Sequence, residues 1–211
     1  SLLDLRQSLK KAGATLLVRR GSCLEVFEKL YESTEFQRIH SHQETGNDVT
    51  YRRDKKMKAW TKHHQIDWIE YRQHGVVRRL NNRNSWSSQW LQLMRKRSFS
   101  VPTLRVRMNE IKSERIPETH ELFSDKPPNT SWRIGGEQNA YETLETFLES
   151  RGRNYQREMS SPLTAEDSCS RLSAYIAYGN ISMRTIFQRI ERQKRRLRNS
   201  EEHRQYQTKA W

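Results

Sequence analysis

The segment Asp167–Ser173 places small hydroxyl side chains next to a cation where a helix is expected to begin. It reads Asp-Ser-Cys-Ser-Arg-Leu-Ser, so Ser170 and Ser173 offer hydroxyl donors and Arg171 offers a guanidinium. The first turn of a helix has unpaired N–H groups and a positive dipole end, which together bind phosphate. The segment therefore predicts a phosphate or pyrophosphate site on a helix that starts near Ser168. An ordinary N-capped helix is the alternative.

Other residues that could do chemistry are expected to be structural. His40, His42 and Glu44 alternate at the end of a possible strand and would lie on one face. Nothing nearby completes a coordination set, so we expect surface residues and no metal site. Trp86 and Trp90 could stack on bases, but a place in the core is the expectation. No GxSxG, HExxH, Walker-type GxxxxGK or post-strand GxGxxG sequence occurs.

Hydrophobic periodicity predicts an α/β arrangement for the first half of the chain. The expected elements are, in order, a helix over 2–9 ended by Gly13, a strand over 14–18, a helix after the cap Ser22, a strand over 38–40, a helix over 50–64, a strand over 66–71 and a helix around 86–94. Such alternation with short connections is typical of a doubly wound parallel sheet. Because these domains normally start with a strand, we expect the sheet to be incomplete at its N-terminal end.

The second half of the chain is expected to be helical. Residues 98–134 hold four of the five prolines and little periodicity, which predicts an interdomain linker. Strand signals disappear from Gly135, and helices are expected over a stripe from Tyr141 to Leu148, from about Ser168, and over 182–197, with a fourth candidate in the tail to Trp211. The predicted domains are an α/β domain over 1–97 and the start of an all-helical domain over 135–211.

Composition and charge narrow the class of partner. The 211 residues are 33% hydrophobic, and 39 basic against 25 acidic side chains give a net charge of +14. Basic residues gather in 51–100, with 13 against three acidic ones, and in 184–198, with seven against Glu191. Such surfaces attract nucleic acid in a salt-dependent way, although a solvated helix face is the alternative.

The same composition favours a cytoplasmic protein that does not cross a membrane. No run approaches the roughly 18 apolar residues that span a bilayer, and no secretory signal is visible. The two cysteines, Cys23 and Cys169, are expected to be reduced thiols.

Several motifs resemble those of DNA photolyases and cryptochromes. The start of the family's flavin-binding domain, with its approximate pattern TSRLSPYLxxGxxSxR, is similar to Gly136-Glu137, Leu144–Leu148, Tyr155, Ser170–Ser182 and Arg184. The family's α/β domain is similar to Ser1–Leu9, Leu16–Gly21 and Glu25–Phe27, and its bacterial branch to Glu44-Thr45-Gly46, Arg53-Asp54 and Gln73–Leu80 with Trp86. The resemblance covers Ser1 to about Arg198, and its SRLS segment is the most specific part.

The resemblance implies a light-driven, FAD-dependent repair enzyme for pyrimidine dimers in DNA. It assigns FAD binding to Tyr155, Cys169, Ser170, Arg171, Leu172 and Ser173. Cys169 stands where the family usually has Thr, and Ala174 where it has Pro. The family's photochemical residues come later than Trp211, so we expect a chain truncated at both ends, with no catalytic residue and without stoichiometric FAD.

Two other functions remain open under the same resemblance. One is a cryptochrome-type blue-light sensor that binds FAD without repair, and the other is a non-enzymatic, basic nucleic-acid-binding protein. A second, antenna chromophore in the α/β domain is compatible with the family, but no residue is assigned to it. The expected partner is DNA that contains pyrimidine dimers, and the protein is expected to be a monomer.

Overall fold

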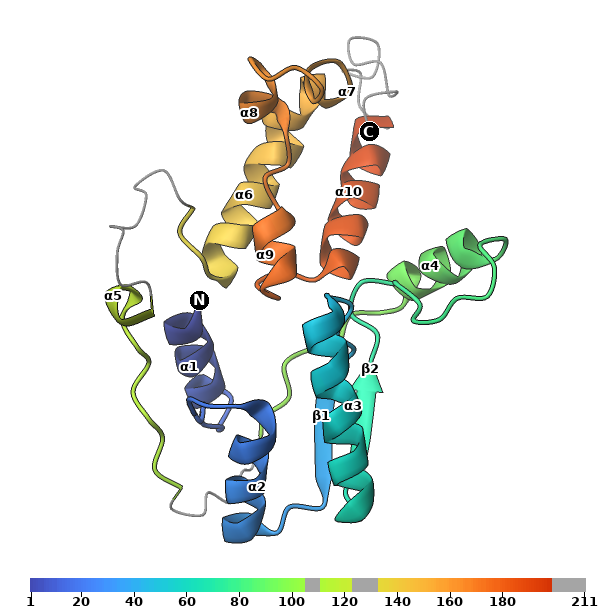
Figure 1. Ribbon diagram of the computed structural model, residues 1–211. Helices are drawn as coiled ribbons and strands as arrows, with labels where there is room; N and C mark the ends of the chain where they lie inside the picture. The colour runs from blue at the N-terminus through green and yellow to red at the C-terminus, as the bar shows by residue number, and fades with distance from the viewer. Residues whose placement is uncertain (105–110, 123–132, 199–211) are drawn as a thin grey trace. The chain divides into compact units, whose positions relative to one another are not determined.

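The computed structural model of the chain describes residues 1–104, 111–122 and 133–198 (Figure 1). These residues belong to two compact units. Of the described residues, the α/β unit contains 6–90, 101–104 and 111–122, and the helical unit contains 1–5, 91–100 and 133–198. The helices α1 (Leu2–Lys11) and α4 (Trp86–Arg95) each contribute residues to both units.

Two parallel strands form the sheet of the α/β unit. β1 (Arg38–His42) pairs with β2 (Asp67–Tyr71) so that Arg38 lies opposite Asp67 and His42 opposite Tyr71. The helix α2 (Cys23–Thr34) precedes β1, and α3 (Asp48–His63) connects the strands, as parallel neighbours require. A short helix, α5 (Thr119–Leu122), follows later in the same unit. The expected helices and strands between residues 23 and 71 are confirmed.

Aromatic side chains build the core of this unit. Met57, Trp60 and Ile66 are buried, and the rings of α2 pack against them. Tyr31 stands edge-on to Trp60 with ring centroids 5.9 Å apart, and Phe36 stands edge-on to Tyr31 at 5.6 Å. Such edge-to-face contacts stabilise the packing beyond the burial of apolar area.

The strand expected over residues 14–18 is wrong, because β1 and β2 are the only strands within the described ranges. The backbone of Val18 makes isolated bonds instead: its N–H donates to Ser113 Oγ at 2.9 Å, and its carbonyl oxygen accepts from Glu114 N–H at 3.1 Å. A strand needs a neighbouring strand with which its backbone forms a regular ladder of hydrogen bonds. An apolar run in the sequence does not show whether such a neighbouring strand is present.

Within the described residues of the helical unit, helices are the only regular secondary structure, which confirms the expected fold class. From residue 133 on, these are α6 (Glu137–Glu149), the 3₁₀-helix η1 (Arg151–Asn154), α7 (Tyr155–Glu158), α8 (Ala165–Ser168), α9 (Ser173–Ala177) and α10 (Met183–Arg198). The expected fourth helix in the tail to Trp211 lies outside the described residues, and so do Pro127 and Pro128 of the predicted linker.

The core of this unit joins α6, α9 and α10. Leu144 of α6 is fully buried, and Tyr175 of α9 and Ile186 of α10 belong to the same apolar cluster. The Tyr175 hydroxyl also donates to Ile134 O at 2.9 Å, which ties the chain before α6 to α9. The cluster places the segment between α8 and α9 on a rigid support.

The core position expected for Trp86 is wrong. Its side chain is 39% exposed, and its ring lies 6.3 Å from that of the half-buried Trp90. The only buried residue of α4 is Met94, near the other end of the helix. Helical spacing placed these residues on one face, but only the last turns of that face are covered.

Candidate functional site

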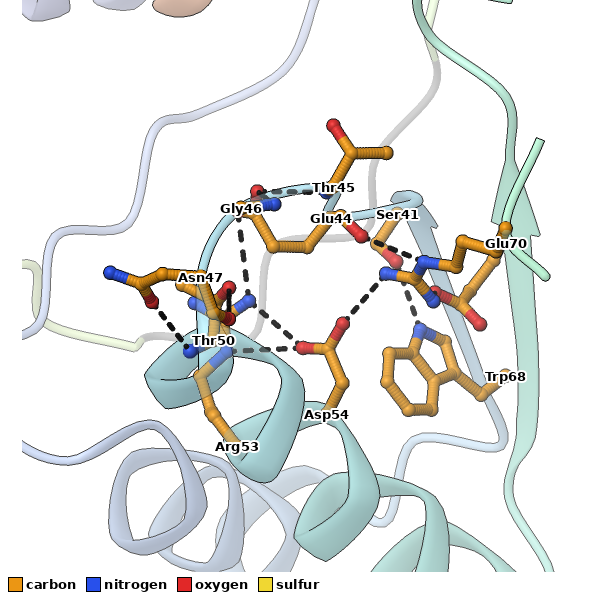
Figure 2. Close-up of polar contacts among 11 residues, drawn as sticks. Ser41, Glu44, Thr45, Gly46, Asn47, Thr50, Arg53, Asp54, Trp68 and Glu70 are labelled. Atoms are coloured by element: carbon orange, nitrogen blue, oxygen red, sulfur yellow. Dashed lines mark hydrogen bonds and ion pairs between the residues drawn. The ribbon is translucent and has the colours of Figure 1, made fainter. Parts of the chain in front are cut away.

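Polar groups gather where the two parallel strands end (Figure 2). Just beyond β1, Glu44 Oε1 accepts hydrogen bonds from the backbone N–H groups of Thr45, at 3.0 Å, and Gly46, at 2.9 Å. Asn47 Oδ1 then accepts from Thr50 N–H at 3.2 Å and caps α3. The turn after β1 is therefore held by side chains at both of its ends.

Arg78 links this turn to the second strand and to α3. Its guanidinium donates to Asp54 Oδ2 at 2.8 Å, to Glu70 Oε1 at 2.9 Å and to the backbone oxygen of Glu44 at 2.7 Å. Arg53 pairs with the same Asp54 at 2.9 Å. The fold thus brings together the motif residues Glu44, Arg53, Asp54 and Arg78, which come from three separate segments of the sequence.

An open cavity of about 450 Å³ lies over this edge of the sheet. Its wall combines the Tyr51 ring with the exposed Val76 and with cations. Arg79 Nη2 donates to the Tyr51 hydroxyl at 3.0 Å, a hydrogen bond that lowers the pKa of Tyr51, and Lys55 Nζ lies 4.4 Å from the ring centroid. An aromatic ring beside positive charge suits a flat ligand that carries an acidic group.

The histidines at this edge form contacts with protein groups. His40 Nδ1 lies 2.9 Å from the Tyr71 hydroxyl, and the two rings are stacked with centroids 5.8 Å apart. Burial lowers the pKa of His74, and the nearby His42 lowers it further, against the opposite effect of Glu44. Across residues 1–104, 111–122 and 133–198, no three His, Cys, Asp or Glu side chains gather in a way that could hold a metal ion.

In the helical unit, the helix expected to start near Ser168 is wrong. Ser168 is the last residue of α8, and its hydroxyl donates to the Glu158 carboxylate. Cys169 is extended, with ψ 152°, and Arg171 adopts a left-handed conformation with φ 61°. A left-handed residue interrupts the helical ladder, so the next helix, α9, begins only at Ser173.

An arginine that was absent from the sequence-based assignment organises this segment. The guanidinium of Arg151, in η1, donates to the carbonyls of Cys169, of Thr143 at 2.7 Å and of Ser170 at 3.4 Å. Burial lowers the pKa of Arg151, and the positive charge of Arg171 adds to that effect. No sequence pattern signals this role, because the contacts reach up to 19 residues along the chain.

Arg171 retains capacity to bind an anion. One of its terminal nitrogens donates to Glu166 O, and another contact joins it to the 89% exposed Asp167 at 3.7 Å. Its Nε is buried and has no hydrogen-bond partner within the described part of the chain. The guanidinium groups of Arg151 and Arg171 place positive charge near Cys169 and Ser170, which suits a diphosphate group.

The remaining assigned residues differ in what they can offer a ligand. Leu172 is 3% exposed and its side chain belongs to the core, so only its backbone is a candidate contact. Ser173 is exposed at the first residue of α9. Tyr155 is half-buried at the start of α7 with its ring edge-on to Phe147 at 5.7 Å.

Comparison with known proteins identifies the fold. Residues 1–85 match the model of the DNA photolyase family. A bacterial class III photolyase from Agrobacterium tumefaciens has a TM-score of 0.65 at 20% identity, and the similarity covers 94% of this chain and 43% of that one. An archaeal photolyase from Sulfolobus tokodaii has a TM-score of 0.53 at 20% identity, over 96% of this chain and 43% of that one. No curated protein matches the sequence.

The architecture is that of photolyases, an α/β unit followed by helices. The match of residues 1–85 to the family model and the similar fold of the two photolyases support the resemblance found in the sequence. The chain spans less than half the length of the two photolyases it resembles. Within the described residues, no helix is long and apolar enough to cross a membrane.

Proposed function

We propose that the protein is a photolyase that binds FAD in its helical unit and repairs pyrimidine dimers in DNA under light. The match of residues 1–85 to the DNA photolyase family carries this proposal. Bound FAD would supply light-driven electron transfer to the dimer. A dimer must leave the base stack to reach a bound cofactor. The net charge of +14 favours binding of the duplex by the protein while the dimer is outside the stack.

The protein's own part in FAD binding is to hold the diphosphate. Arg171 contributes positive charge, and Ser170 and Ser173 contribute hydroxyl groups. Arg151 acts as a positioning residue, since it holds the carbonyls of Cys169 and Ser170 and thereby orients the segment. Cys169 offers only a thiol where the family usually offers a hydroxyl.

The binding site is tested by comparing two arginines. Arg171→Gln removes the guanidinium and should weaken FAD binding by tenfold or more, on the order of the loss of one charge-assisted bond. The control is Arg157→Gln, at an exposed position on α7. FAD affinity is measured by flavin fluorescence, with each variant made in the full chain that the gene encodes. Equal affinities of the two variants would refute the assignment of the segment.

Repair itself distinguishes the candidate functions. The protein is mixed with an oligonucleotide that contains a cyclobutane dimer and is exposed to blue light. Light-dependent splitting of the dimer into two pyrimidines supports the photolyase, and a flavin-bound protein without repair supports the cryptochrome. Salt-sensitive DNA binding without any flavin supports the non-enzymatic protein.

A second chromophore has a candidate site in the α/β unit. We propose the cavity of about 450 Å³ with Tyr51 and Arg79 on its wall, because it can hold a flat, acidic molecule. The Sulfolobus tokodaii photolyase was described with two FAD molecules, with the implication of a novel light-harvesting cofactor. An antenna in this cavity would be consistent with that description.

A further inference from the structure

Two segments about 90 residues apart place their cations on one face of the helical unit. Gln188 Nε2 donates to the carbonyls of Met94 and Lys96, each at 2.9 Å. Ser98 Oγ donates to Gln188 Oε1 at 3.4 Å. These bonds hold the end of α4 and the residues after it against the Gln188 face of α10, and the exposed side chains there are Arg95, Lys96 and Arg97.

The same face of α10 continues with further arginines. Arg192 and Arg195 follow Gln188 by four and seven residues, a spacing that keeps side chains on one face of a helix. Both lie near the neighbouring Arg196 and Arg198 in the last turns of α10. Seven residues of helix extend about 10 Å, so the row of cations is long enough to meet more than one phosphate. We define this set, residues 95–97 with Arg192, Arg195, Arg196 and Arg198, as the α10 basic surface.

The positive charge of this surface is not neutralised by the described acidic residues. Glu191 is the only acidic residue of α10, and its Oε1 forms an ion pair with Lys194 Nζ at 3.5 Å. Glu145 of α6 is paired with Arg189. In the described ranges, Arg192, Arg195, Arg196 and Arg198 have no carboxylate partner.

We infer that the α10 basic surface binds the phosphate backbone of DNA independently of any lesion. Guanidinium groups match phosphate geometry with paired donors. A membrane surface fits less well, because an interfacial helix inserts its apolar side, and on α10 Ile186 and Ile190 pack into the core. The inference rests on the proposed function only in its choice of DNA, since the surface shares no residue with Tyr155 or Cys169–Ser173.

The test measures binding of an undamaged, fluorescent DNA duplex by anisotropy over a series of salt concentrations, in the dark. The first variant carries Arg→Gln at 192, 195, 196 and 198, and the second carries R95Q, K96Q and R97Q. The matched control removes four exposed cations of α1, α2 and the chain between them, as K10Q, K11Q, R20Q and K29Q. Far-UV circular dichroism confirms that each variant is folded.

Both surface variants should bind at least about tenfold more weakly than the control at low salt. Their plots of log K against log salt should be less steep by about 0.9 for each phosphate that the variant no longer neutralises. Arg→Lys at the same four positions of α10 retains the charge and should retain most of the slope.

Equal weakening of the control would overturn the inference, since it would show that only net charge matters. Reduced binding to anionic lipid vesicles with unchanged DNA binding would overturn it as well. Because neither flavin nor a dimer is present, failure of this test is distinct from failure of the proposed repair activity.

Discussion

Single guanidinium groups join segments of this protein that are distant in sequence. Arg78 bonds α3, β2 and the turn after β1, and Arg151 bonds the last turns of α6 to the segment after α8. Each has donors arranged in a planar fork, which lets one side chain reach several acceptors at once. At the scale of residues, both candidate sites therefore depend on arginines that contact protein groups rather than a ligand.

The contribution of Arg78 can be measured against an exposed arginine pair. Arg78→Lys keeps the charge but cannot reach Asp54, Glu70 and the Glu44 carbonyl together. We expect the free energy of unfolding to fall by about 2 kcal/mol. The control, Arg38→Lys, affects the exposed pair of Arg38 with Asp67 at 3.0 Å and should cost less than about 1 kcal/mol. Urea denaturation followed by tryptophan fluorescence gives both values, and similar decreases would contradict this role.

His74 predicts a dependence of stability on pH. Burial lowers its pKa in the folded state below the ordinary value of 6.5, so the unfolded chain binds more protons as the pH falls. The stabilisation is therefore complete above 6.5 and is lost progressively as the pH falls below that value. His74→Gln should reduce this loss, whereas His63→Gln, at an exposed position of α3, should leave it unchanged. Urea midpoints at several pH values provide the measurement. Parallel profiles for the wild type and His74→Gln would contradict the assignment.

At the scale of elements, helix ends position the site residues. The side chains of Ser22 and Asn47 accept backbone bonds at the starts of α2 and α3, so both helices begin where local sequence indicates. The break between α8 and α9 is different, because the left-handed Arg171 creates it. This break exposes the backbone around Cys169 to the Arg151 guanidinium.

The Asn47 cap supports both α3 and the wall of the cavity. Asn47→Ala leaves Thr50 N–H without its side-chain acceptor and should lower the free energy of unfolding by about 1 kcal/mol. Asn47→Asp retains an acceptor and should be close to the wild type. Thermal denaturation compares the three proteins, and an Asn47→Ala protein as stable as the wild type would exclude a capping role.

At the scale of the whole molecule, two compact units carry two candidate chromophore sites. The cavity with Tyr51 belongs to the α/β unit, and the segment with Arg171 belongs to the helical unit. Sites supported by separate cores are expected to lose their ligands separately. The strong positive charge is shared by both units, with its largest clusters in residues 51–100 and 184–198.

The independence of the two sites is tested by absorption spectra of the purified protein. Tyr51→Ala should reduce absorbance of the second chromophore and leave flavin absorbance unchanged, because it removes only the aromatic wall of the cavity. Arg171→Gln should do the reverse. If either variant reduced both absorbances together, the two sites would be coupled or wrongly assigned.

The sequence by itself predicted most elements and indicated the family that the chain resembles. The stripe Val26, Phe27, Leu30 and Tyr31 after the cap Ser22 predicted α2, and similar local signals predicted α3, β1, β2, α6 and α10. The SRLS segment and the motifs around Glu44 indicated photolyases. Local patterns were sufficient here because helix periodicity and capping depend on residues only a few positions apart.

Only the tertiary structure decided how distant segments meet. In the structure, residues 14–18 form no strand and Trp86 is exposed. The helix expected from Ser168 begins at Ser173, and the acceptors of Arg78 and Arg151 come from distant segments of the chain. Strand pairing and long-range hydrogen bonds depend on which groups the folded chain presents to each other, and spacing along the sequence does not encode that. The domain boundaries at 97 and 134 and the FAD contacts therefore stay predictions.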